Sequence, residues 1–301
     1  MKSIIKKAML IATGAVLSLS VGAQDISKHE VSVYGAGGLS TLDYDVRIGG
    51  KTKGAGGFLG LGYSYSITDF LKVNTGFEFT MYNSKLDAKN FNYNYAGLVD
   101  DSEGLEREYD FYSSILNYEE KQTATYLNIP VMAQFSVLND KIYLAGGMKF
   151  GVPVSGKSKS SDSKIVNRAY YVAEDNWALD QEFRGLGTFE NKELKSDFDL
   201  KVACIASLEA GYKFKLKDNM SLYAGAYFDY GLNNLQDNTG KSFLNLSASE
   251  TSVNFKTESM LNSKYMIGDE TTGNLRDEEF TKRVKVMAAG VKVRLGLNLS
   301  K

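Results

Sequence analysis

The segment from Ser196 to Gly231 constrains the fold more than any other part of the chain. From Phe198 to Leu216 the even positions are apolar and the odd positions, apart from Ile205, are small or charged. After Lys217-Asp218-Asn219, the same alternation runs from Met220 to Tyr230. Side chains alternate between the two faces of a β-strand, so this segment predicts a hairpin with one continuous apolar face. Its first strand has about nineteen residues, and a strand needs only about 9–11 to cross a bilayer. The hairpin therefore predicts a transmembrane β-barrel.

The N-terminus has the features of a secretory signal. Lys2, Lys6 and Lys7 precede an apolar run from Ala8 to Val21, and the small residues up to Ala23 offer a cleavage site. We expect a signal peptide at residues 1–23 and one outer-membrane β-barrel domain at residues 24–301. The alternative, a membrane anchor, is disfavoured because the run is short and rich in small residues.

Alternation predicts six further strands, which makes eight in total. They cover about Glu30–Leu42, Gly54–Ile67, Phe70–Asn83, Lys121–Val137, Lys141–Val154 and Phe280–Leu299. Near Val284 and Val286 the alternation is less clean, which indicates either a bulge or the rim of the barrel.

The connections between the predicted strands differ greatly in length. Those after the second, fourth and sixth strands have two or three residues. Three others are long: Ser84–Glu120, Ser155–Lys195 and Leu232–Glu279. Short turns at one end and long loops at the other are typical of outer-membrane barrels. We therefore predict an all-β fold, an eight-stranded antiparallel up-and-down transmembrane β-barrel with short periplasmic turns and long extracellular loops.

The interior of an eight-stranded barrel is just wide enough for side chains to fill it. The face opposite the apolar one carries both signs of charge, so we predict a lumen filled by an ion-pair network. The alternative is a narrow path for ions or protons. The residues expected in this network are Glu78, Lys149, Asp199, Lys201, Glu209, Lys213, Asp229, Lys292 and Arg294.

Two segments resemble a known family. Tyr34-Gly35-Ala36-Gly37-Gly38 in the first strand and Tyr126-Leu127-Asn128-Ile129-Pro130-Val131 in the fourth are similar to the small outer-membrane β-barrel proteins of the porin-like and opacity types. The resemblance implies the barrel and a location in the bacterial outer membrane. It implies no catalytic residues.

Residues that commonly form catalytic or metal-binding sites are scarce in this sequence. The sole histidine, His29, precedes the first strand, which places it away from the long loops. Histidine-dependent catalysis in those loops is therefore excluded. The single cysteine, Cys204, lies on the apolar face of its strand and cannot complete a zinc site. We expect no catalytic, cofactor-binding or metal-binding residues, no cofactor and no enzymatic activity.

The long loops are the predicted interaction surface. Ser84–Glu120 carries nine acidic and three basic residues, and this acidity disfavours nucleic acid as a partner. Tyr93 and Tyr95, which alternate with asparagines, and Trp177, the only tryptophan, are candidate loop contacts. For Tyr93 and Tyr95 the alternative is a strand that continues above the membrane. For Trp177 it is a small core within the loop.

Together these features predict a non-enzymatic outer-membrane protein. It would serve as surface structure, or bind a ligand or partner through its long extracellular loops. Its partners would be outer-membrane lipid and an extracellular ligand or envelope protein. Two alternatives stay open: a narrow channel for a small solute, and an accessory factor in secretion or envelope assembly.

Overall fold

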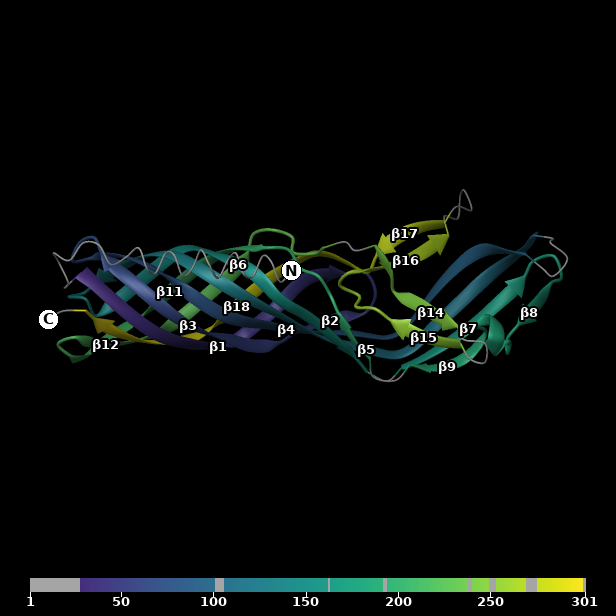
Figure 1. Cartoon of the computed structure of the whole chain (residues 1–301), viewed down its shortest axis with the longest axis horizontal. Coiled ribbons are helices and arrows are strands. Elements are labelled where there is room, and N and C mark those ends of the chain that lie inside the picture. Colours follow the sequence, from purple (N-terminus) through teal and green to yellow (C-terminus); the bar gives the residue numbers. More distant parts are fainter. Residues whose placement is uncertain are drawn as a thin grey trace.

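Eight long strands form a closed antiparallel ring in the computed structural model (Figure 1). The structure describes residues 28–100, 106–161, 163–191, 194–237, 240–248, 253–268 and 275–299, and the expected signal peptide lies outside this range. Each strand pairs with the next along the ring, and the last pairs with the first, so the expected eight-stranded barrel is confirmed. The ring consists of β1 (His29–Val46), β3 (Ala55–Ser66), β4 (Leu71–Asp100), β5 (Glu106–Val137), β6 (Ile142–Ser160), β11 (Ala203–Lys217), β12 (Met220–Gly231) and β18 (Thr281–Asn298).

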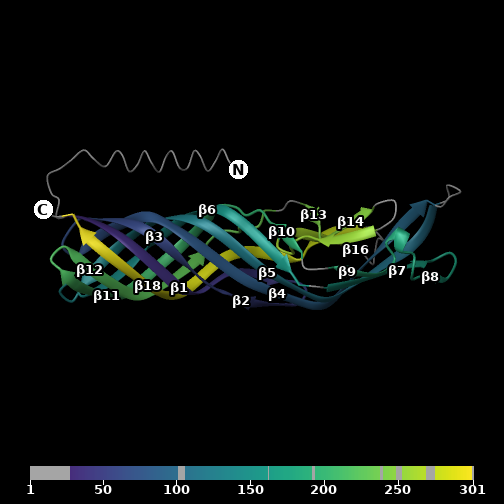
Figure 2. The same cartoon turned by 60° about the horizontal axis from the view of Figure 1, so that its bottom comes forward.

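The two ends of the barrel differ. At one end, which we call the turn end, short turns join β3 to β4, β5 to β6 and β11 to β12. The amide of Leu299 donates to the carbonyl of His29 at 2.9 Å, so the start of β1 and the end of β18 also lie here (Figure 2). All longer connections leave from the opposite end, which we call the loop end.

The strands present an apolar belt on the outside of the ring. Alternation places one set of side chains outward and the other into the lumen, where Tyr34, Phe58 and Tyr227 are buried. A small residue makes room there: a Cβ on Gly60 would lie 2.5 Å from the Tyr34 ring. The outward set remains exposed although it is apolar, as lipid contact requires. It includes Val33, Leu59, Leu61, Phe79, Val131, Phe135, Leu144, Phe150, Leu208, Phe214, Phe228, Val291 and Val293.

Strands β4 and β5 continue far beyond the belt. They pair from Leu71↔Phe135 to Asp100↔Glu106, so most of the expected loop Ser84–Glu120 is a β-hairpin. The hairpin continues because apolar side chains beyond the belt, such as Leu86, Phe91 and Ile115, are buried in a hydrophobic core. The expected strand ends at Asn83 and Lys121 were therefore wrong.

The other long connections also contain strands, which pack around this hairpin (Figure 1). β7 pairs with β5, and β8 and β9 pair with β7, which extends the hairpin sideways into a sheet. We call β7–β9 and the parts of β4 and β5 beyond the belt the superstructure. The elements outside the ring are β2 (Gly50–Lys53), β7 (Ser163–Tyr171), β8 (Asn176–Ala178), a 3₁₀ turn at Glu182–Arg184, β9 (Gly187–Asn191), β10 (Lys195–Asp197), β13 (Lys241–Ser242), β14 (Leu244–Ala248), β15 (Val253–Thr257), β16 (Ser263–Gly268) and β17 (Leu275–Glu279).

An aromatic core joins these connections to the barrel at the loop end. The rings of Phe91 and Phe243 lie 5.9 Å apart, and Phe280 contacts both. Tyr118 and Tyr265 complete the cluster through Phe243 and Phe280 respectively. The core therefore links β4, β5, β16 and the start of β18.

The sixth strand begins later than its sequence pattern predicts. β11 starts at Ala203, and the preceding segment leaves the ladder because the amide of Phe198 donates to Gly156 and that of Lys201 donates to Leu235. Phe198 then turns inward to join the buried cluster. Of the two alternatives near Val284, the bulge is confirmed, since the β1–β18 register shifts between Asp43 and Asp45. Among the described residues, no helix has the length and apolar character needed to cross a membrane.

Candidate functional site

A buried lysine organises the middle of the lumen. Lys149 projects from β6, and its Nζ lies 2.9 Å from a carboxylate oxygen of Glu78 on β4 and 2.9 Å from one of Asp229 on β12. All three side chains are buried. Lys292 on β18 approaches Glu209 on β11 at 2.5 Å and Glu78 at 3.9 Å. These five side chains cross the whole lumen and connect strands from opposite sides of the ring.

A second network fills the lumen nearer the turn end. Lys72 lies 3.2 Å from Glu30, which also accepts a hydrogen bond of 2.8 Å from the Tyr223 hydroxyl. The guanidinium of Arg294 lies 3.9 Å from the centre of the Tyr223 ring and donates to Gln134. The Tyr223 ring therefore offers Arg294 a favourable cation–π contact, and its hydroxyl binds Glu30.

The described lumen is electrically balanced and nearly full. Its four buried carboxylates are matched by four buried cations: Glu30, Glu78, Glu209 and Asp229 against Lys72, Lys149, Lys292 and Arg294. Between the two networks lies a polar cavity of about 20 Å³, lined by residues that include Ser32, Glu209 and Lys292. That volume holds about one water molecule. The balance and the packing together favour a plug over a wide path.

The structure brings together six of the nine residues expected in the lumen network, at the positions given above, and the amine of a seventh, Lys213, lies 5.7 Å from the centre of the Tyr223 ring. Lys213 lies close to the turn end, where it bonds to Asp140. Asp199 and Lys201 precede β11 and are exposed, because the chain has left the ladder there and the inward phase has reversed. The expectation of these two in the lumen is therefore corrected.

Sequence reasoning missed Glu30 and Lys72. Lys72 occupies an inward position in the alternation of β4, which was a usable signal. Glu30 lies at the start of its strand, where alternation carries little information.

A turn from the last long connection closes the lumen at the loop end. Met260 and Leu261 are fully buried beneath the aromatic core. The side-chain amide of Gln236 donates to the carbonyls of Leu261 and Thr281, which anchors the turn to β18. We call residues 258–262 the closing turn.

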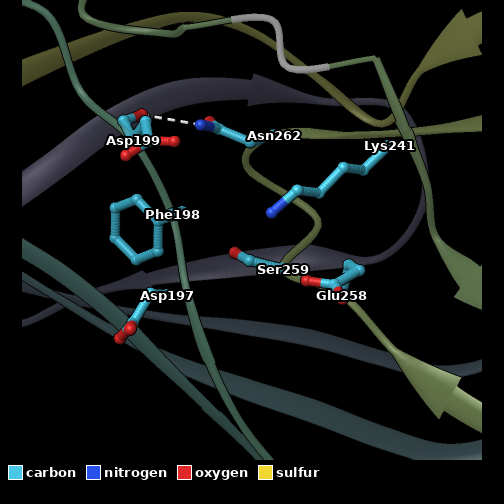
Figure 3. Close-up of a pocket in the computed structure, with 7 residues that line it drawn as sticks. All are labelled: Asp197, Phe198, Asp199, Lys241, Glu258, Ser259 and Asn262. Atoms are coloured by element: carbon cyan, nitrogen blue, oxygen red, sulfur yellow. Dashed lines mark hydrogen bonds between the residues drawn. The ribbon is translucent and has the colours of Figure 1, made fainter.

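The closing turn packs tightly against the segment that precedes β11 (Figure 3). Asn262 donates from its side chain to the carbonyl of Asp199 at 2.6 Å. The space between the two segments, lined also by Phe198, Lys241 and Ser259, is a cavity of about 10 Å³. The contact therefore leaves room for about one water molecule at most.

A buried carboxylate on β5 binds the closing turn through hydrogen bonds. Glu120 on β5 lies beyond the belt and accepts hydrogen bonds from the amide of Met260 at 2.9 Å, from Tyr118 at 3.0 Å and from Gln122 at 3.1 Å, and also from the Ser259 hydroxyl. Burial raises the pKa of the Glu120 carboxyl above its ordinary value, although these hydrogen bonds oppose the rise.

Replacing Glu120 with glutamine tests this contact through its pH dependence. Because the folded-state pKa is raised, Glu120 contributes most stability below its ordinary pKa, and that contribution is lost as the pH rises through the folded-state pKa. We expect the wild-type closing turn to become more susceptible to protease as the pH rises from the ordinary glutamate pKa through the raised folded-state pKa. The Glu120→Gln variant should not show this pH-dependent increase. Proteolysis at several pH values, with an acid-tolerant and a neutral protease, measures it. Equal pH slopes in both proteins would contradict the assignment.

The candidate loop contacts lie on the superstructure. Trp177, on β8, is exposed, and its ring lies 5.1 Å from that of Tyr112 and 5.2 Å from that of Tyr170. Arg168 approaches the same ring. The backbones of Tyr93 and Tyr95 pair with Ser113 and Phe111, which agrees with a strand that continues above the belt, but their side chains lie outside the described part of the chain.

Within the part of the chain that the structure describes, the usual metal-binding side chains do not gather in one place. His29 lies at the turn end, where its ring contacts the Tyr63 hydroxyl at 2.5 Å. In the described ranges, no cluster of three or more histidine, cysteine, aspartate or glutamate side chains could hold a metal ion.

Similarity to solved structures is distant. Neisserial surface protein A is 9% identical, with 90% of this chain and 96% of that chain covered and a TM-score of 0.34. The translocator domain of the autotransporter NalP from Neisseria meningitidis is 8% identical, with coverage of 98% and 95% and a TM-score of 0.23. The outer-membrane protease OmpT from Escherichia coli is 9% identical, with coverage of 90% and 93% and a TM-score of 0.22. At these values the similarity carries no argument about activity.

The family assignment rests on the sequence itself. No curated protein matches the chain. The model of the outer membrane protein beta-barrel domain matches residues 23–236, which is most of the chain and most of the ring. The chain therefore belongs to the outer-membrane β-barrel protein family, and it resides in the bacterial outer membrane.

Proposed function

We propose that this protein is a non-enzymatic surface protein that holds a folded superstructure outside the cell for binding an extracellular ligand or envelope partner. The observation that carries the proposal is the β4–β5 hairpin, which continues beyond the belt and supports β7–β9. A rigid platform of this kind lowers the entropy that a binding surface loses when it is occupied.

The filled lumen supports the same function. Buried ion pairs around Lys149, the closing turn and the aromatic core succeed one another along the barrel axis. Each layer occupies space that a solute would need. The exposed Trp177, together with Tyr112 and Tyr170, provides the type of rigid aromatic surface that dominates many binding interfaces.

A narrow channel is the second candidate, and the polar cavity beside Glu209 and Lys292 favours it. Conductance across planar bilayers separates the two functions. We expect no unitary openings from the wild-type protein at moderate voltage, because the lumen is filled and closed. Openings in wild type that vanish in Lys149→Met or Glu209→Gln would overturn our proposal and establish conduction through the lumen.

A further inference from the structure

One face of the superstructure sheet carries aromatic side chains grouped around an arginine. Tyr112 on β5 is directly opposite Arg168 on β7. Tyr170, also on β7, is directly opposite Trp177 on β8. The Trp177 ring lies 5.1 Å from that of Tyr112 and 5.2 Å from that of Tyr170. The Arg168 guanidinium lies 5.6 Å from the centre of the same ring. We call these four residues the aromatic face.

A small core on the other side of the sheet holds the aromatic face in place. Side chains alternate along β7 and β8, so Ala169 and Ala178 point away from the aromatic face, and they are buried together with Leu186. Tyr109 and Phe111 pack against the same core. The aromatic face is therefore preformed, and little entropy is lost in ordering it when a partner binds.

The aromatic face lies far from the membrane. Ile129 is the last exposed apolar side chain of the belt on β5, and Tyr112 lies about 17 residues beyond it, or about 55 Å along an extended strand. Figure 1 shows β7 and β8 at one end of the molecule and the turn end at the other. The lipid around the barrel is therefore out of reach, and a partner of this face must come from the extracellular medium.

Exposed apolar side chains adjoin the aromatic face. Val172, in the turn between β7 and β8, and Leu179, directly after β8, are both exposed, and Trp177 is 44% exposed. Among the superstructure side chains that the structure describes, these three are the only exposed large hydrophobic ones. Single exposed hydrophobic residues are ordinary, but these three lie close together in the chain. With Tyr112, Tyr170 and Arg168 they have the composition of a protein-binding hot spot, in which tryptophan, tyrosine and arginine are enriched.

The charges around the aromatic face favour a basic partner. Asp110 is directly opposite Tyr170, and Asp175 accepts a hydrogen bond of 2.5 Å from the Tyr170 hydroxyl. Asp180, in the segment after β8, is exposed. Three carboxylates therefore border a face that contains the single guanidinium of Arg168.

Two other cations near β7 are directed elsewhere. Lys164, further along β7, is directly opposite Glu190 on β9. Arg184 donates to the Tyr171 hydroxyl, and Tyr171 packs against the core on the other side of the sheet. Neither cation therefore balances the aspartates at the border of the aromatic face.

We propose that the aromatic face binds a basic segment of an extracellular protein, with an apolar side chain of that segment against Trp177 and its lysine or arginine side chains beside the three aspartates. A cation of the partner can also stack on the exposed side of the Trp177 ring. This inference rests on the proposed binding function and names the class of its partner.

Two other occupants fit the aromatic face less well. A second copy of this chain would place the aspartates opposite one another, because a two-fold interface joins the same surface on both subunits. A glycan would leave the aliphatic side chains of Val172 and Leu179 in water, whereas a protein segment covers them.

Tryptophan-free peptides test the site on the wild-type protein. Full-length protein in zwitterionic detergent micelles would select binders from a displayed library of random peptides without tryptophan, after counter-selection on empty micelles. Trp177 is the only tryptophan of the chain, so its fluorescence reports on this face. We expect the selected peptides to combine lysine or arginine with apolar residues. They should shift the Trp177 emission to shorter wavelength and protect it from acrylamide, because binding removes the ring from water.

Variants of the full-length protein locate the binding, measured by the fluorescence anisotropy of labelled peptide. Trp177→Ala should weaken binding at least about ten-fold, and Trp177→Phe, which keeps an aromatic ring, should stay within about three-fold of wild type. Asp110→Asn/Asp175→Asn should weaken it about three- to ten-fold at low salt and less at high salt, because salt screens exposed charges. The matched control, Asp69→Asn/Asp218→Asn, removes two exposed aspartates at the turn end and should leave the affinity unchanged.

Several results would overturn the inference. Selected peptides that bind Trp177→Ala as tightly as wild type would place the binding elsewhere and leave the proposed function standing. Selection of acidic peptides would refute the basic partner, and a glycan from an array that binds only when Trp177 is present would assign the face to sugars. Dimers that Trp177→Ala abolishes would assign it to a second copy. If neither peptides nor glycans bind, the proposed function fails as well. If Trp177→Ala misfolds, an unchanged Trp177 emission in wild type at saturating peptide decides against the site.

Discussion

Lys149→Met is expected to destabilise the barrel by about 3–5 kcal/mol, because it leaves Glu78 and Asp229 buried without their shared cation. Methionine keeps the volume of the side chain but supplies no charge. The nearest remaining cation to Glu78 is Lys292, at 3.9 Å. Guanidinium unfolding in detergent micelles, followed by far-UV circular dichroism and by heat-dependent gel migration, measures the loss.

Two comparison variants identify the cause. Adding Glu78→Gln and Asp229→Asn to Lys149→Met should restore most of the lost stability, since neutral amides can hydrogen-bond to each other and to Ser207, which bonds to Asp229. Lys213→Met removes a lysine whose partner, Asp140, is 45% exposed. It should cost at most about 1 kcal/mol. If Lys149→Met and Lys213→Met destabilise equally, the lumen network does not hold the barrel together as described.

Phe280→Ala is expected to lower the free energy of unfolding of the loop end by about 3–5 kcal/mol, while the membrane ring stays intact. Phe280 is buried, and its ring lies 4.9 Å from that of Phe243 and 4.5 Å from that of Tyr265. Its loss leaves a cavity among segments that join the superstructure and the closing turn to β18. Since those segments have fewer hydrogen-bonded neighbours than the ring, they should open first.

Limited proteolysis of the protein in micelles tests this outcome. Cleavage between residues 240 and 268 should become faster in Phe280→Ala, whereas heat-dependent gel migration, which reports the ring, should not change. Leu179→Ala is the matched control, because Leu179 is 47% exposed on the superstructure. If Phe280→Ala unfolds ring and superstructure together, the two are one cooperative unit.

The membrane ring could be predicted almost entirely from sequence. Alternation at Leu71–Met81 or Leu208–Phe214 has one physical cause, since a strand between lipid and lumen must place apolar and polar side chains in turn. The same rule placed Glu78, Lys149 and Asp229 inside. It failed at Asp199 and Lys201, because backbone bonds to Gly156 and Leu235 redirect the chain before β11.

The loop end could not be predicted in the same way. Leu86 and Phe91 are buried there by residues from distant parts of the chain, such as Phe243 and Phe280. The local sequence pattern does not predict which distant residues these are. Three separate strand pairings place Lys85 opposite Lys121, Lys121 opposite Lys159 and Lys159 opposite Lys195. In sequence these lysines are merely charged residues in three different predicted loops or strands.

By itself, the sequence determined the barrel, its membrane belt and the charged character of its lumen, because lipid imposes a two-residue period on every strand that crosses it. Only the tertiary structure decided which lumen charges pair, and how the closing turn and Glu120 seal the loop end. These features depend on strand register and on contacts between segments that are far apart in the sequence. Neither produces a periodic pattern of residues that could be recognised in the sequence.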